Sequence, residues 1–273
     1  MTADRHSLVV AWLAAEGECR RRAEEEAVDL LVQDYKSRWP NLIPTELHRL
    51  ASTLNTEIVR MRDLKGDAFL LPTHTGFRIL VKGGLHVARY RTSVAHELAH
   101  ILFYSGPENG QPRRIIRHSQ REEYFCFDVA RRILSPIEHL KAIKVFDDNN
   151  PLTIFLKLTR TLLLSRPWAA RVMLADYSLA KGIAGRWVKT ENGWKQQPGS
   201  ATASPTLSHA ERRKFREMAK KHLESQTTEV PGYHIFSVEE KTSGGIFVMV
   251  ASQSRVCEPP DSGSSGVKPS NFD

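Results

Sequence analysis

The run His96-Glu97-Leu98-Ala99-His100 holds the side chains of this 273-residue chain that are best suited to chemistry. It lies in an apolar stretch with helical periodicity, where residues four apart share one face. His96 and His100 can therefore offer their imidazoles to one ion, with Glu97 in reach of a water on that ion. This H-E-x-x-H pattern is typical of zinc hydrolases, which keep one metal position open. The alternative, a chance match on an ordinary amphipathic helix, is rare in a chain of this length.

A tetrahedral zinc site with two histidines and a water needs one more protein ligand. The segment that begins at His118 offers three candidates: His118 itself, Glu122 and Glu123. Ser119 followed by Glu122 is a capping-box pattern, in which the glutamate folds back on the start of a helix. We therefore favour Glu123 as the ligand and keep His118 and Glu122 as alternatives. Without the upstream motif, both glutamates would be interpreted as a solvated first helical turn.

Several blocks between residues 42 and 136 resemble the ImmA/IrrE family of zinc-dependent metallo-endopeptidases. Residues 89–102 are similar to the family's R-x-R-F-T-x-A-H-E-L-G-H-x-L-L pattern, and residues 123–136 to its E-x-x-C-[DN]-x-F-A-x-x-L-L-M-P pattern. The stretch 47–81 is similar to its helix, short turn and strand, but this block is weak by itself. The two later blocks, in this order, are fairly specific, and the stretch from 42 to 136 covers about a third of the chain.

The resemblance implies that His96, His100 and Glu123 bind zinc and that Glu97 is the catalytic acid/base. It also implies limited, regulatory proteolysis of a protein substrate, often a helix-turn-helix transcriptional repressor. The chain departs from the family pattern at Phe127, where relatives carry an Asp or Asn that supports the metal ligands. This departure bears on metal affinity and not on the fold.

The predicted mechanism uses one zinc ion per chain, whose bound water loses a proton to Glu97. A further donor to the developing oxyanion is usual. The candidates for this role or for substrate contact are Tyr90, Tyr104, His118 and Tyr124. A tyrosine near a helix end is more often a packed ring with a wet hydroxyl. The β-prone stretch Phe77–Val81 could be an edge strand that binds a substrate peptide, although a plain structural strand fits equally well.

Composition narrows the class of protein further. The hydrophobic content of 41% is enough for a proper core. The cysteines Cys19, Cys126 and Cys257 are odd in number and far apart, so we expect a reducing, cytoplasmic compartment. The net charge of +8 permits contact with nucleic acid, but no DNA-binding motif supports it and we do not favour it. No apolar run approaches the length of a membrane span.

The pattern of elements predicts an α+β protein. We expect a mainly helical, zincin-like metallopeptidase core with a small sheet, followed by a smaller α/β accessory region. Helices are expected over residues 7–37 and Thr45–Met61, and Thr92 and Ser93 are expected to cap the motif helix. The predicted boundaries are an N-terminal helix (1–40), the metallopeptidase core (41–140), a helical extension (141–185), an accessory region for sensing or substrate recognition (186–260) and a disordered tail (261–273).

The sequence therefore predicts a zinc metallo-endopeptidase, and two rival hypotheses remain. The first rival is a zinc-containing, DNA-associated regulatory or stress-response protein with little or no protease activity. A structural zinc site has no use for a carboxylate at the water position, so Glu97 argues against it. The second rival is a zinc hydrolase of other bonds, which the shape of the cleft would distinguish.

Overall fold

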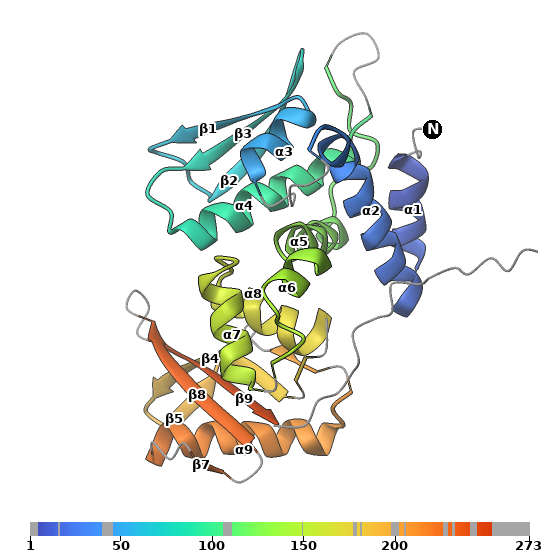
Figure 1. Ribbon diagram of the computed structural model, residues 1–273. Coiled ribbons are helices and arrows are strands. Elements are labelled where there is room, and N and C mark those ends of the chain that lie inside the picture. The colour runs from blue at the N-terminus through green and yellow to red at the C-terminus, as the bar shows by residue number, and fades with distance from the viewer. Residues whose placement is uncertain are drawn as a thin grey trace, which may run out of the picture. The chain divides into compact units, whose positions relative to one another are not determined.

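The computed structural model is mixed α+β, which confirms the predicted class (Figure 1). It describes residues 5–15, 17–39, 46–105, 111–148, 150–176, 179–180, 182–197, 202–204, 206–225, 229–230, 233–240 and 245–252. The predicted tail, residues 261–273, lies outside these described ranges. The chain divides into two compact units, Met1–Val145 with Leu156–Ala169, and Phe146–Phe155 with Ala170–Asp273.

The N-terminal segment forms two helices, α1 (Arg5–Ala14) and α2 (Gly17–Arg38), so the prediction of one helix over residues 7–37 is wrong. The chain folds back because α1 is apolar and would lose that burial in one straight helix. Trp12 of α1 is buried, and its indole N–H donates to Glu24 of α2 at 3.3 Å. The result is a helical hairpin that packs within the first unit.

Helix α3 (Leu47–Thr53) ends early and is followed by the strand β1 (Thr56–Met61). The predicted helix over Thr45–Met61 is therefore wrong in its second half. Asn55 adopts a left-handed conformation with a φ of 50°, which asparagine tolerates and which ends the helix. The β-branched residues that follow it suit a strand better than a helix.

A three-stranded sheet is completed by β2 (Ala68–Thr73) and β3 (Gly76–Lys82), in the order β1-β3-β2. Strand β3 pairs parallel with β1 and antiparallel with β2. The stretch Phe77–Val81 thus forms the expected strand, but it lies in the centre of the sheet and the edge-strand hypothesis is wrong. Gly76 allows close packing here, since a Cβ at this position would lie 2.1 Å from the Asn55 carbonyl oxygen.

Helix α4 (Val87–His100) carries the H-E-x-x-H motif and packs on this sheet (Figure 1). Its N-cap is His86, whose Nδ1 accepts from the Ala88 N–H, so the predicted caps Thr92 and Ser93 lie inside the helix. The helix continues into a short 3-10 turn, η1 (Ile101–Phe103), whose residues are all buried.

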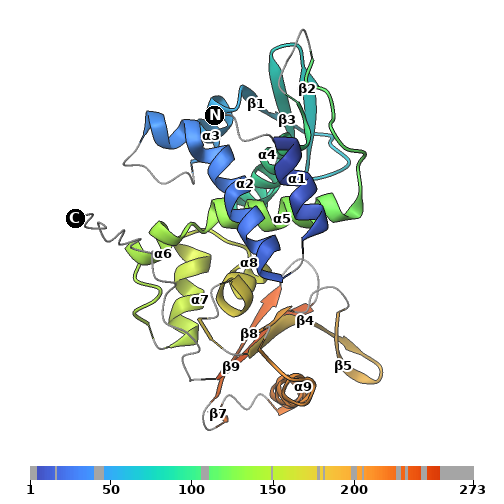
Figure 2. The same cartoon turned by 90° about the vertical axis from the view of Figure 1, so that its right-hand side faces the viewer.

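Helix α5 (Gln120–Leu134) packs against both α4 and α2 (Figure 2). Ser119 is its N-cap, as predicted, and its hydroxyl accepts from the Glu122 N–H at 3.3 Å. The apolar face of α5, which includes Phe125 and Val129, is fully buried. The short helix α6 (Ile137–Ala142) follows it.

The chain continues with helices α7 (Pro151–Arg160) and α8 (Arg166–Arg171), and each of them contains a boundary between the two units. Helix α8 runs on into a π-helical turn, η2 (Val172–Asp176). The second unit is built on an antiparallel sheet in the order β5-β4-β9-β8-β7, with β6 paired to β4. These strands are β4 (Gly182–Thr190), β5 (Gly193–Gln196), β6 (Thr202–Ala203), β7 (Glu229–Val230), β8 (Tyr233–Glu240) and β9 (Gly245–Ser252).

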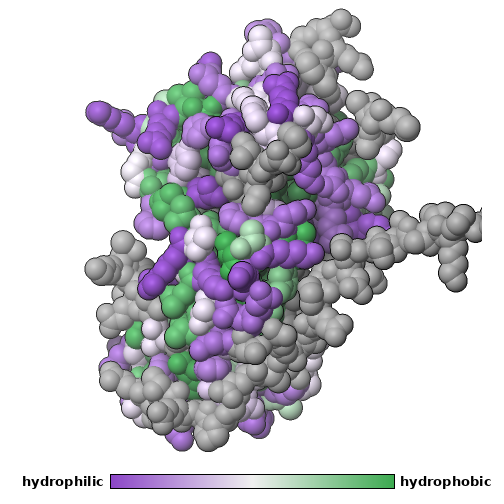
Figure 3. Space-filling model, in the orientation of Figure 1, coloured by the Kyte–Doolittle hydropathy of each residue, from purple (hydrophilic) through white to green (hydrophobic). Residues whose placement is uncertain are grey.

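Helix α9 (His209–Ser225) lies along one face of this sheet (Figure 1). Phe215 and Ala219 of the helix pack on Trp187 and Val250 of the strands. Among the described residues, no helix combines the length and apolar character that a membrane crossing requires. On the face drawn in Figure 3, hydrophilic residues predominate and hydrophobic residues gather in smaller patches between them.

Candidate metal centre

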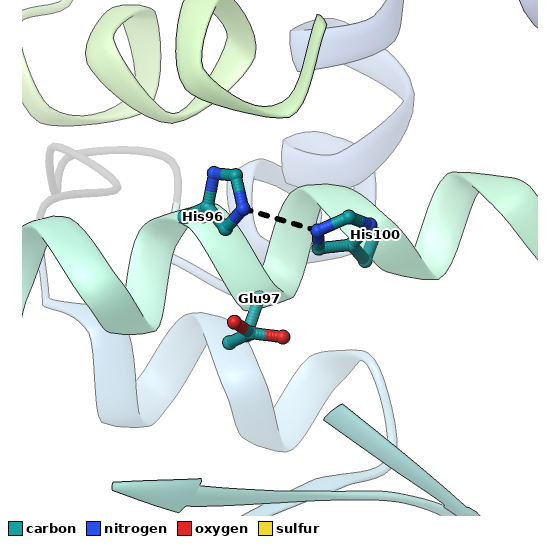
Figure 4. Close-up of side chains that lie close together, drawn as sticks. All are labelled: His96, Glu97 and His100. Atoms are coloured by element: carbon teal, nitrogen blue, oxygen red, sulfur yellow. Dashed lines mark hydrogen bonds between the residues drawn. The ribbon is translucent and has the colours of Figure 1, made fainter. Parts of the chain in front are cut away.

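The two histidines of the motif face each other on α4. His96 Nε2 lies 3.0 Å from His100 Nε2, and the rings meet at 83° (Figure 4). Both side chains are buried, because the residues around them form the face of α4 that packs on α5 and the sheet. Two imidazoles with Nε2 atoms this close need a cation or a proton between them.

Helix α5 brings Glu123 to the same point. Its Oε2 lies 3.1 Å from His96 Nε2, and its Oε1 lies 3.5 Å from His100 Nε2. The hydrogen bond with His96, together with a second one to His118, lowers the pKa of Glu123 to about 2 although burial opposes this. Glu123 is therefore an ionised carboxylate beside both imidazoles.

The side chain of Glu122 bonds to His100 and Arg114, whereas the capping box predicts that it folds back on the start of α5. Its Oε1 lies 2.7 Å from His100 Nδ1, and Arg114 donates to both of its carboxylate oxygens. Burial by itself would raise the pKa of Glu122, but the hydrogen bonds from His100 and Arg114 lower it overall. An ionised Glu122 accepts the proton on Nδ1, so Nε2 of His100 carries the lone pair that points toward His96.

Glu97 projects from a different side of α4 than the two imidazoles (Figure 4). One of its carboxylate oxygens still lies within 4.8 Å of the ligand atoms of His96 and His100. Burial raises the pKa of Glu97, while the two imidazoles and the backbone N–H of Leu70 partly offset that rise. Leu70 belongs to β2, an edge strand of the small sheet, so this strand runs beside the centre.

The ring of Phe127 packs against the imidazole of His96, with ring centroids 4.1 Å apart. It also meets Trp168 edge-on at 6.4 Å. Nδ1 of His96 is buried and has no hydrogen-bond partner within the described part of the chain. The departure from the family pattern at position 127 therefore has a structural counterpart, because an apolar ring packs against this imidazole.

Within the described residues, two groups of side chains could hold a metal ion: His96 with Glu97 and His100, and His100 with Glu122 and Cys126. Burial raises the pKa of the Cys126 thiol well above its ordinary value. A protonated thiol is a poor ligand, and Glu122 is already bonded to Arg114. The first group, joined by Glu123, is the better candidate.

The other residues predicted for the site differ in whether they contact His96, His100 and Glu123. His118 is mostly exposed, and its Nε2 lies 2.7 Å from Glu123 Oε1. The Tyr90 hydroxyl bonds to His48 Nε2 at 2.9 Å, and the Tyr124 hydroxyl accepts from Gln120 at 3.3 Å. These contacts bring His118 to the centre and give neither tyrosine a role there.

Tyr104 is buried and accepts from Arg114 at 3.3 Å, so it contacts the centre only through Arg114 and Glu122. Sequence reasoning missed the contribution of Arg114 and misread that of Glu122. Arg114 stands in an irregular segment with no motif. The one feature of the sequence that could have indicated the role of Glu122 is that it is a second acidic residue directly beside the favoured ligand, Glu123.

Comparisons with known proteins add no assignment to this geometry. No family model matches the chain, and no curated protein matches it.

Proposed function

We propose that this protein is a zinc-dependent metallo-endopeptidase of the ImmA/IrrE type that performs limited regulatory proteolysis. One observation carries the proposal: the Nε2 atoms of His96 and His100 and the carboxylate of Glu123 converge, with the Glu97 carboxylate beside them. Three ligands of this kind with a fourth position left open are typical of catalytic zinc and not of structural zinc.

The spacing of the three ligands suits zinc. Zinc lies about 2.0–2.2 Å from nitrogen and oxygen ligands, so two ligands of a tetrahedral site lie about 3.3–3.6 Å apart. The distances of 3.0, 3.1 and 3.5 Å between these ligand atoms are close to that range. Histidine and carboxylate are also ligands that zinc accepts readily.

A bound zinc ion would supply an activated water and polarise a carbonyl group. Glu97 is suited to take a proton from a water and pass it to a leaving amine. Its raised pKa brings it nearer to neutrality, where a general base works best. The N–H of Leu70 keeps its carboxylate in place on the side of the strands.

Strand β2 offers a way to bind a peptide. Because it is an edge strand, one side of its backbone is unpaired in the small sheet, and Leu70 places that strand beside Glu97. An extended substrate could add to this edge by main-chain hydrogen bonds. The exposed side chains of Phe69 and Leu71 on the same strand would give such a substrate apolar contacts. The substrate we favour is a transcriptional repressor, as the resemblance implies.

A substrate trap tests the proposal. Glu97→Gln should still bind zinc, since the two histidines and Glu123 remain, but it should lack the base. We expect this variant to capture an intact protein that the wild-type enzyme shortens at one place. His100→Ala is the matched control, because it should bind little zinc and cut nothing.

Two results would speak against a peptidase. If wild-type protein and Glu97→Gln both hold zinc, yet neither captures nor cuts a protein, the zinc-containing regulatory protein becomes the better hypothesis. If Glu97→Gln cuts as fast as the wild type, the proposed base is wrong.

A further inference from the structure

We propose that Arg114 is a positioning residue, which acts through Glu122 to hold the Nε2 lone pair of His100 at the metal centre. The inference rests on the proposed metal centre but not on peptidase activity. Its central residue, Arg114, lies in no sequence motif.

Arg114 is held in place on several sides. Its Nε donates to the Ile116 carbonyl at 3.0 Å, its Nη1 donates to the Tyr104 hydroxyl at 3.3 Å, and its guanidinium lies 5.4 Å from the Tyr104 ring centroid. Its backbone forms an antiparallel bridge with Tyr104. The neighbouring Ile115 N–H donates to the Phe103 carbonyl at 2.8 Å. The segment that carries Arg114 is thus fastened to the chain that directly follows His100.

The remaining nitrogen, Nη2, is directed at Glu122 and contacts both carboxylate oxygens. Glu122 is 1% exposed, so in the folded protein its carboxylate is satisfied by these bonds and by His100, and not by bulk water. A buried carboxylate is costly unless it is paired and hydrogen-bonded, and breaking such a pair costs far more than breaking a surface pair. Arg114 is therefore the group that makes a charged Glu122 tolerable at this position.

Glu122 in turn accepts from His100 Nδ1 at 2.7 Å. This bond fixes both the tautomer of His100 and the rotation of its ring. His96 has no such support, since its Nδ1 lacks a partner within the described residues and Phe127 packs against its ring. The two histidine ligands are thus held by different means, and the path through Arg114 serves His100 alone.

Loss of an outer-shell partner typically weakens metal binding by about 10–100-fold. We therefore expect Arg114→Gln to bind zinc about 10–100-fold more weakly than the wild type. Arg114→Lys keeps the charge but lacks the planar guanidinium, which also bonds to the Ile116 carbonyl and the Tyr104 hydroxyl, so its affinity should fall between the two. Arg113→Gln is the matched control, because Arg113 is an exposed neighbour of the same charge and should bind zinc normally.

The experiment uses the full chain and zinc alone, with affinity measured by competition against a chelator. A second readout is the pair of ring ¹⁵N chemical shifts of His100 in the metal-stripped protein. In the wild type and Arg113→Gln they should report a proton on Nδ1. In Arg114→Gln they should report a mixture of tautomers. A residue that only stabilised the fold would not change this signature in a protein that remains folded.

If Arg114→Gln does not fold, Arg114→Lys carries the test with the same two readouts. The inference is overturned if the folded Arg114 variants bind zinc as tightly as Arg113→Gln and keep the wild-type shifts of His100. A wild-type protein that binds no zinc would instead contradict the metal centre itself. Peptidase activity enters neither readout, so its absence affects only the proposed function.

Discussion

The ring of Phe127 packs against the imidazole of His96 at a centroid distance of 4.1 Å. Phe127 lies on α5, the helix that also supplies Glu123. The contact gives one proposed metal ligand an apolar neighbour, and Nδ1 of that histidine has no hydrogen bond in the described part of the chain. A ligating histidine normally donates its second ring N–H to a carboxylate, a carbonyl or water. In the proposed centre, Nδ1 of His100 therefore has a hydrogen-bond partner, whereas Nδ1 of His96 has none within the described residues.

This asymmetry predicts that Phe127→Asn strengthens metal binding. The amide oxygen of the new residue can accept from His96 Nδ1, so we expect zinc affinity to rise by up to about tenfold. Phe127→Ala removes the ring without adding an acceptor, and it should leave affinity equal or lower. Chelator competition on both variants makes the comparison. Equal affinity in the Asn and Ala variants would show that the missing partner has no influence.

A second prediction concerns Glu123 in the metal-stripped protein. Its pKa in the folded state is about 2, below the ordinary 4.5, so it stabilises the fold fully above pH 4.5. This contribution is lost as the pH falls toward 2. Because the side chain is 34% exposed, the effect should be modest.

Glu123→Gln therefore should be less stable than the wild type at pH 7, and the difference should shrink on acidification. Urea unfolding of both proteins at pH 7, 4 and 3 measures this. A difference that stayed constant, or grew toward acid, would mean that the carboxylate is not held in its ionised form by its neighbours.

Packing of the N-terminal hairpin supports the helix that carries Glu123, and this gives a third prediction. Trp12 is 1% exposed, and its ring meets that of Phe125 on α5 edge-on at 4.7 Å. Trp12→Ala should lower the free energy of unfolding by about 3–5 kcal/mol. Val10→Ala is the control, since Val10 lies exposed on the same helix and should have little effect. Comparable losses in both variants would contradict the packing role of Trp12.

Sequence reasoning succeeded where a short, local pattern determines the structure. The four-residue spacing of His96 and His100 places them on one helical face, and Ser119 caps α5 as its type predicts. The mixed α+β class followed from the alternation of helical and β-prone stretches. In each case the decisive residues are close together in the chain.

Sequence reasoning failed where residues that are far apart in the chain determine the local structure. The apolar spacing after Leu54 suits a helix, but the left-handed Asn55 and the pairing of β1 with β3 make a strand. Glu122 satisfies the capping-box rule, yet a buried His100 and Arg114 compete for its carboxylate. Neither partner can be recognised from the segment itself.

The metal content of the purified protein tests the central claim most directly. Elemental analysis should find about one zinc per chain in the wild type and in Glu97→Gln, whose three ligands are intact. His100→Ala and Glu123→Ala should retain little or none after the same purification. A wild-type protein without zinc, or ligand variants that keep it in full, would contradict a metal centre formed by His96, His100 and Glu123.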